Sequence, residues 1–265
     1  MYMTGTCALC GLNEPLLDSH FMPRSLYQEL HEPNFTIKQM IVLRADKTNQ
    51  SGQQFSMHLL CQACEIRFQQ GGEEWTLGNR YRSDGSFLLR DHLLNASPVE
   101  MKPDGSRVFE ARTVAGLALD RLVYFAVSIF WRAGIADWRV KFADAPKIDL
   151  DASLMTELQQ YLLGKAPLPS RVSIFVAVDE APAPWRAMWS PKKQNDRPLL
   201  RYSFYIPGMI MELGIDLPQK ERIPSISDPV ELIVLTNAVH SYVAAMGSRL
   251  VETSEVSKSL SKHLT

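Results

Sequence analysis

Long hydrophobic runs, a secretory leader and spare cysteines are all missing from this sequence of 265 residues. Its longest apolar stretch lies at residues 123–131, much shorter than the roughly 20 residues that a membrane-spanning helix needs. The first residues, MYMTGT, have neither the basic nor the apolar segment of a secretory leader. We therefore expect a cytoplasmic protein with no membrane partner.

The chain also lacks a bias toward one sign of charge, because its formal net charge is −1. A nucleic-acid-binding protein of this composition must concentrate positive charge in a local patch or use a bound metal. Hydrophobic residues make up 46% of the chain and charged residues 22%. These values are typical of globular proteins and argue against a largely disordered chain.

Cysteines occur only as two pairs with the spacing Cys-x-x-Cys: Cys7 with Cys10, and Cys61 with Cys64. In a reducing cytosol, two such pairs favour a metal over a disulfide. Each short turn directs two sulfurs toward one ion, so the two pairs predict a tetrahedral Cys₄ zinc site. The alternatives are two unrelated buried pairs or a redox pair, although a redox pair needs no second pair. A closed Cys₄ site stabilises a small fold but carries no chemistry.

The predicted fold class is α+β. Residues 1–95 are rich in turns and polar residues and are predicted to form a zinc-bound module, whereas residues 96–265 are predicted to form a larger α+β domain. In the larger part we expect helices at 113–135 and 152–164, strands at 171–178 and 199–215, and a strand followed by a helix at 228–250.

Two further motifs have ordinary interpretations. The sequence GGEEW at 71–75 follows a predicted helix, and its acidic pair is expected to be solvated or to place Glu74 near a metal site. The sequence APAPWRAMWSPKK at 181–193 is predicted to be a loop. Its Trp185 and Trp189 either cover a hydrophobic sheet face or stack on bases.

Between the cysteine pairs lies DSHFMPRSLY, residues 18–27, and the second pair lies within LLCQACEIRF, residues 59–68. Together these motifs resemble the HNH, or His-Me finger, endonucleases. They most resemble zinc-containing bacterial HNH-like proteins, some of which are associated with mobile elements and antiviral defence. The resemblance covers residues 5–80, with a weaker similarity at 124–132. It implies a treble-clef zinc fold, or ββα-metal module, in residues 1–95.

The same resemblance implies roles for two residues. His20 matches the general base that takes a proton from the water attacking a phosphodiester. Glu65 stands where the family usually has a His or Asn metal ligand, and a carboxylate is a suitable ligand for Mg²⁺. One divalent ion, usually Mg²⁺ in this family, would stabilise the phosphate and the leaving oxygen.

Two other positions differ from the family pattern. Ser19 stands where an Asp or Glu normally precedes the histidine, and Ser56 replaces the central Asn. Asp18 and His58 lie close by in sequence and are additional candidates for the site. On a strand, Asp18 would point to the face opposite Ser19. The sequence leaves two alternatives here, a rebuilt metal site or an inactive one.

The predicted function is a metal-dependent endonuclease that acts on DNA rather than RNA, in bacterial antiviral defence, with structural Zn²⁺ and catalytic Mg²⁺ or another divalent ion. Arg24 and Arg67 are predicted to contact nucleic acid, although the first 95 residues have eight Lys/Arg against ten Asp/Glu. The alternative is a catalytically degenerate zinc module that binds nucleic acid or a protein. We expect the C-terminal domain to recognise a protein partner or to regulate the module.

Overall fold

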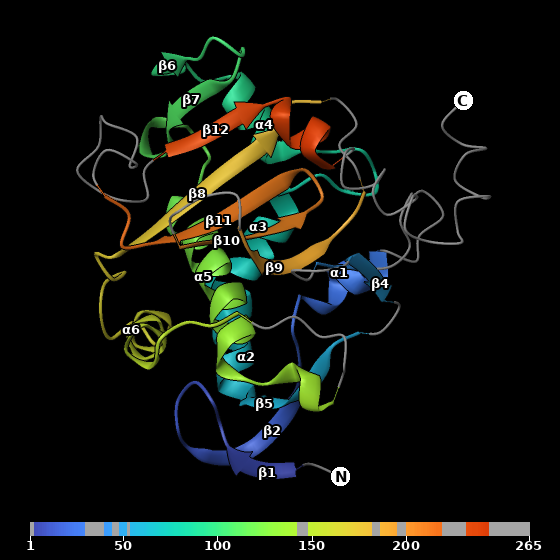
Figure 1. Ribbon diagram of the computed structural model, residues 1–265, viewed down its shortest axis with the longest axis vertical. Helices are drawn as coiled ribbons and strands as arrows, with labels where there is room; N and C mark the ends of the chain where they lie inside the picture. Colours follow the sequence, from blue (N-terminus) through green and yellow to red (C-terminus); the bar gives the residue numbers. More distant parts are fainter. Residues whose placement is uncertain are drawn as a thin grey trace, which may run out of the picture.

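The computed structural model describes residues 3–29, 40–43, 48–51, 54–141, 148–181, 186–194, 200–218 and 232–243. These residues form two β-sheets and a set of helices (Figure 1), which confirms the α+β class. No helix within the described ranges is long and apolar enough to cross a membrane.

The small sheet contains three antiparallel strands in the order β1-β2-β5. They are β1 (Met3–Thr6), β2 (Asn13–His20) and β5 (Ser56–Cys61). Three helical elements follow these strands in the chain: α1 (Arg24–Glu29) after β2, then α2 (Gln62–Phe68) and α3 (Glu74–Asn79) after β5. The first cysteine pair therefore lies in the turn after β1, and the second at the junction of β5 with α2.

The large sheet has nine strands in the order β4-β3-β9-β10-β11-β8-β12-β7-β6. Its pairs are antiparallel except β8 with β12 and β3 with β9. Two of its strands, β3 and β4, come from the predicted zinc module, so the two predicted parts share this sheet. The strands are β3 (Met40–Leu43), β4 (Thr48–Ser51), β6 (Glu100–Met101), β7 (Arg107–Glu110), β8 (Val172–Asp179), β9 (Trp189–Lys193), β10 (Arg201–Ile206), β11 (Met209–Ile215) and β12 (Leu232–Thr236).

The central helix, α5 (Leu119–Ile135), lies between the two sheets in Figure 1 and contacts β9 and β11. Twelve of its 17 residues are buried, which explains why its sequence is apolar on nearly every side. The helix was predicted to begin at residue 113, but it begins at Leu119. Gly116 has a φ of +81°, a left-handed conformation that cannot continue a right-handed helix.

The segment after α2 packs tightly against α5. It forms a π-helical turn, η1 (Gln69–Glu73), and a Cβ atom at Gly72 would lie 2.4 Å from the carbonyl oxygen of Arg121. Glu73 is not solvated as expected, because its Oε1 lies 2.6 Å from a guanidinium nitrogen of Arg132. The same guanidinium lies 4.7 Å from the ring centre of Phe68. Glycine thus permits the close approach, and a buried ion pair joins the two segments.

The other elements of the larger part mostly follow the prediction. Helix α6 (Ala152–Leu162), strand β8 and the β10–β11 hairpin occupy the expected positions, and helical residues 238–243 follow β12. The loop prediction for 181–193 was wrong at its end, where β9 forms. Trp189 is fully buried there and stacks on Tyr205 at 4.6 Å, so it cannot stack on bases. Trp185 lies outside the described residues. Helix α4 (Leu88–Leu94) packs against β8.

Candidate metal centre and the adjoining histidine face

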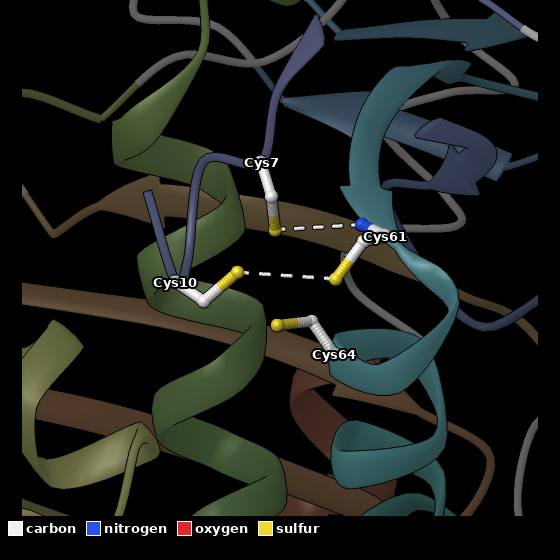
Figure 2. Close-up of side chains that lie close together, drawn as sticks. All are labelled: Cys7, Cys10, Cys61 and Cys64. Carbon is white, nitrogen blue, oxygen red and sulfur yellow. Dashed lines mark hydrogen bonds between the residues drawn. The ribbon is translucent and has the colours of Figure 1, made fainter. Parts of the chain in front are cut away.

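The four cysteine side chains converge between the β1–β2 turn and the start of α2 (Figure 2). Their sulfur atoms all lie within 4.8 Å of one another, and those of Cys10 and Cys61 are 3.9 Å apart. Among the described residues, this is the only group of three or more His, Cys, Asp or Glu side chains that could hold a metal ion. The cysteine pairing predicted from the sequence is therefore present as a four-sulfur cluster.

Backbone hydrogen bonds shape the first cysteine turn. The N–H of Cys7 donates to the carbonyl of Leu12 at 2.8 Å, and the N–H of Gly11 donates to the carbonyl of Cys7 at 2.9 Å. Gly11 has a φ of +75°, which favours glycine at this position. The N–H of Ala8 donates to the carbonyl of Leu59 at 3.0 Å. The turn is thus tied to β5, the strand that carries the second pair.

The sulfurs differ in how readily they ionise. Burial opposes the Cys7 thiolate, but the backbone N–H groups of Cys10, Cys61 and Leu9 stabilise it and lower its pKa to about 7. Burial raises the pKa of Cys64, and the neighbouring sulfurs raise it further. Burial also raises the pKa of Cys61. Four thiolates at this spacing repel one another, so a bound cation is needed to ionise them all. The cluster could hold a metal ion such as zinc.

Helix α6 supports the first cysteine turn. The side-chain amide of Gln159 donates to the carbonyl oxygens of Leu9 at 2.6 Å and Ala8 at 3.3 Å. Arg67, on α2, donates to the carbonyl of Leu163 just after α6 at 3.3 Å. Both cysteine-bearing segments are therefore held by residues that lie 96 to 151 positions further along the chain.

His20 ends β2, on the opposite side of the strand from Ser19. Ser19 is 1% exposed, and its Oγ accepts a hydrogen bond from the N–H of Leu60 at 3.1 Å. Asp18 is exposed and lies on the same face as His20, because side chains alternate along a strand. This confirms that Asp18 points away from the side that Ser19 occupies.

The ladder between β2 and β5 adds two more predicted residues to this face. His20 pairs with Ser56 and Asp18 pairs with His58, after a bulge between Leu17 and Asp18. The hydroxyl of Ser56 donates to Asp18 Oδ2 at 2.8 Å. The Nδ1 of His58 donates to the carbonyl of Leu16 at 3.2 Å. We call the set Asp18, His20, Ser56 and His58 the histidine face.

Two residues that were not predicted from the sequence contact the histidine face. The Nε2 of His20 lies 3.2 Å from Oε1 of Gln54. Lys141 comes from the segment after α5, and its Nζ donates to the carbonyl of Ser56 at 2.7 Å and lies 3.9 Å from Asp18 Oδ1. No local sequence signal points to Lys141, since it lies 85 positions from Ser56.

Glu65 is the next residue after Cys64 on α2. Its Oε1 is shielded from solvent and has no hydrogen-bond partner among the described residues. No hydrogen bond or ion pair between described residues joins Glu65 to His20. The structure thus gathers Asp18, Ser56 and His58 beside His20, but records no contact that links Glu65 to them.

The two arginines predicted to contact nucleic acid lie on different helices. Arg24 is the first residue of α1 and is exposed. Arg67 is in the last turn of α2 and is also exposed, while it holds the carbonyl of Leu163. Both can reach solvent ligands, and their contact with nucleic acid stays a prediction.

A buried carboxylate in the large sheet was not predicted from the sequence. Asp179 ends β8 with no exposed surface, and Nδ1 of His240 lies 3.5 Å from its Oδ2. The N–H of Ala181 donates to Oδ1 at 3.0 Å. Burial raises the pKa of Asp179, against the opposing effects of the Ala181 hydrogen bond, His240 and Arg90.

Comparisons with protein-family models, with curated proteins and with solved structures find no match to this chain. The resemblance to HNH endonucleases therefore rests on the motifs alone.

Proposed function

We propose that the protein is a metal-dependent HNH-like endonuclease that hydrolyses the phosphodiester bonds of DNA. The observation that carries the proposal is the position of His20. It ends the central strand of a small sheet whose neighbouring segments carry the cysteine cluster, and it shares one face with Asp18 and Ser56. In this account zinc holds the cysteine turn, β5 and α2 together as a treble clef.

In this proposal the catalytic ion is held by two carboxylates, of which only Asp18 belongs to the histidine face. Glu65 suits this role, because its buried Oε1 lacks a hydrogen bond and an unpaired buried carboxylate oxygen is unfavourable without a cation. Asp18 offers a second carboxylate, on the same face as His20. When bound, a divalent ion would stabilise negative charge on the phosphate and the leaving oxygen.

His20 would act as the general base. The Nε2 of His20 lies 3.2 Å from Oε1 of Gln54, an acceptor that favours the tautomer with the proton on Nε2. In that tautomer Nδ1 would take the proton of the attacking water. The ammonium group of Lys141 lies beside Asp18 and adds positive charge that favours a phosphate at this face.

A second candidate function is binding of nucleic acid or a protein without catalysis. The hydrogen bond between His20 and Gln54 favours it, because this bond can have a purely structural role. The histidine face also forms no three-ligand cluster within the described residues.

The test is cleavage of plasmid DNA, single-stranded DNA and RNA by the zinc-loaded full-length protein, with Mg²⁺, Mn²⁺ or EDTA. Loss of the general base in His20→Ala should slow metal-dependent cutting by about 10²-fold or more. His92→Ala, on α4, is the control and should cut as the unaltered protein does. Zinc content is measured for each variant, so that misfolding is not mistaken for lost chemistry. Failure of the unaltered protein to cut any substrate would favour the binding function, and cutting by His20→Ala would remove His20 as the base.

A further inference from the structure

The cysteine cluster is open to solvent on one side. A groove of about 810 Å³ is lined by Cys10, Cys61 and Cys64. Its other walls come from β2, α2 and the end of α6, and they include Leu12, Ile66 and Leu163. A small reagent that enters this groove therefore meets a wall that includes three of the four cysteines.

The sulfurs are not equally accessible from the groove. Cys7 does not line it, has no exposed surface, and its sulfur accepts the N–H of Cys61 at 3.4 Å. Cys10 is only half-buried, whereas Cys61 is 5% and Cys64 4% exposed. The sulfur of Cys61 lies 3.9 Å from that of Cys10. Cys10 is thus the first sulfur in the path of a reagent, and Cys61 is close enough to react next.

We propose that hydroperoxides enter through this groove and oxidise the cysteine cluster. This inference rests on the metal centre of the proposed function. The thiolate of Cys10 attacks a peroxide oxygen, the O–O bond breaks, and a sulfenic acid and hydroxide form. The thiolate of Cys61 then attacks the sulfenic sulfur, forms a disulfide and releases a second hydroxide. The two thiolates lose two electrons, and hydrogen peroxide gains them.

Oxidation of this pair removes two of the four ligands and releases the metal. The disulfide then ties the cysteine turn to Cys61 at the end of β5, and Gln159 still holds the carbonyls of the turn, but Cys64 of α2 is no longer linked to the turn through the ion. A thiol reductant together with zinc should restore the centre.

The test treats the zinc-loaded full-length protein with hydrogen peroxide and follows zinc release with a colorimetric chelator. After alkylation of the remaining thiols, peptide mass spectrometry locates the disulfide. We expect zinc release to accompany a Cys10–Cys61 disulfide while Cys7 stays alkylated. These readouts do not involve DNA cleavage, so they succeed or fail independently of the nuclease proposal.

Variants that fill the groove test the route. Ile66→Trp and Leu12→Trp change residues that are 41% and 60% exposed, so at least one should fold with full zinc content. Release should slow at least about fivefold in these variants, since thiol oxidation depends on access to the sulfur. Leu88→Trp, on α4, is the matched control and should behave as the unaltered protein. Three results would each overturn the proposal. They are oxidation of Cys7 before Cys10, zinc release from a zinc-loaded groove-filled variant as fast as from the unaltered protein, and retention of zinc in excess peroxide.

Discussion

The three-stranded and nine-stranded sheets differ in how much their strands bury. In the small sheet no residue of β1, two of eight in β2 and four of six in β5 are buried, whereas all six residues of β10 are buried. The large sheet rests on aromatic side chains such as Phe204, which packs against Phe125 and Phe130 of α5. Apolar burial can stabilise the large sheet alone. The small sheet depends on its cysteine cluster and on α6, whose Gln159 holds the cysteine turn, as small folds with little core often depend on added links.

The largest effect is expected from Cys64→Ser. Structural zinc sites contribute roughly 10–16 kcal/mol of apparent binding free energy, and much of it is lost with one thiolate ligand. The purified variant should contain little zinc, while the large sheet keeps its unfolding transition. Metal analysis and thermal unfolding measure both, and a variant with full zinc content would contradict the role of Cys64.

A smaller but still large effect is expected from Arg132→Met. This change leaves Glu73 without its partner, and breaking a buried ion pair costs roughly 3–5 kcal/mol. The pair joins η1 to α5, so the loss measures how strongly the two regions depend on each other. The matched control is Arg171→Met, which breaks more exposed pairs with Asp151 and Glu157 and should cost about 1 kcal/mol. Equal costs in urea unfolding would show that burial does not matter here.

The sequence predicted features that depend on local patterns. The cysteine spacing predicted the cluster, and alternating or continuous apolar residues predicted α6, β8 and the β10–β11 hairpin. Features made by distant segments were not predictable in this way. The ion pair of Glu73 with Arg132 joins residues 59 positions apart, and Lys141 reaches Ser56 across 85. The strand that contains Trp189 was predicted to be a loop, because the prolines near it are typical of loops.

Gln159→Leu should have a moderate effect on the metal centre. It removes the amide that holds the carbonyls of Leu9 and Ala8, but it leaves all four ligands in place. Loss of such supporting groups typically weakens metal binding 10–100-fold, and about tenfold is expected here because the bonds go to the backbone. Zinc transfer to a competing chelator measures the change, and Gln160→Leu is the control. Unchanged affinity would mean that the turn holds its shape without α6.

The smallest effect is a pH dependence in the large sheet. Burial raises the pKa of Asp179 above its ordinary value of 3.8, so the folded state binds this proton more tightly than the unfolded state does. The resulting stability is fully present below pH 3.8 and is lost as the pH rises through the raised pKa. The stability of the unaltered protein relative to Asp179→Asn should therefore fall as the pH rises from about 4.

The control for that pH dependence is Asp84→Asn, which should give the opposite trend. Hydrogen bonds from Ser86 lower the pKa of Asp84, so its contribution is present at higher pH and is lost as the pH falls. Thermal unfolding over a pH series measures both differences. Parallel trends for the two variants would contradict the assigned burial of Asp179.

Hydrogen exchange of the full-length protein, before and after a chelator removes its metal, tests the contrast between the two sheets most directly. Exchange reports local stability segment by segment. We expect β2, β5 and α2 to lose protection when the metal leaves, while β8, β10 and β11 keep theirs. An equal loss of protection in both sheets, or unchanged protection in β2 and β5, would contradict this expectation.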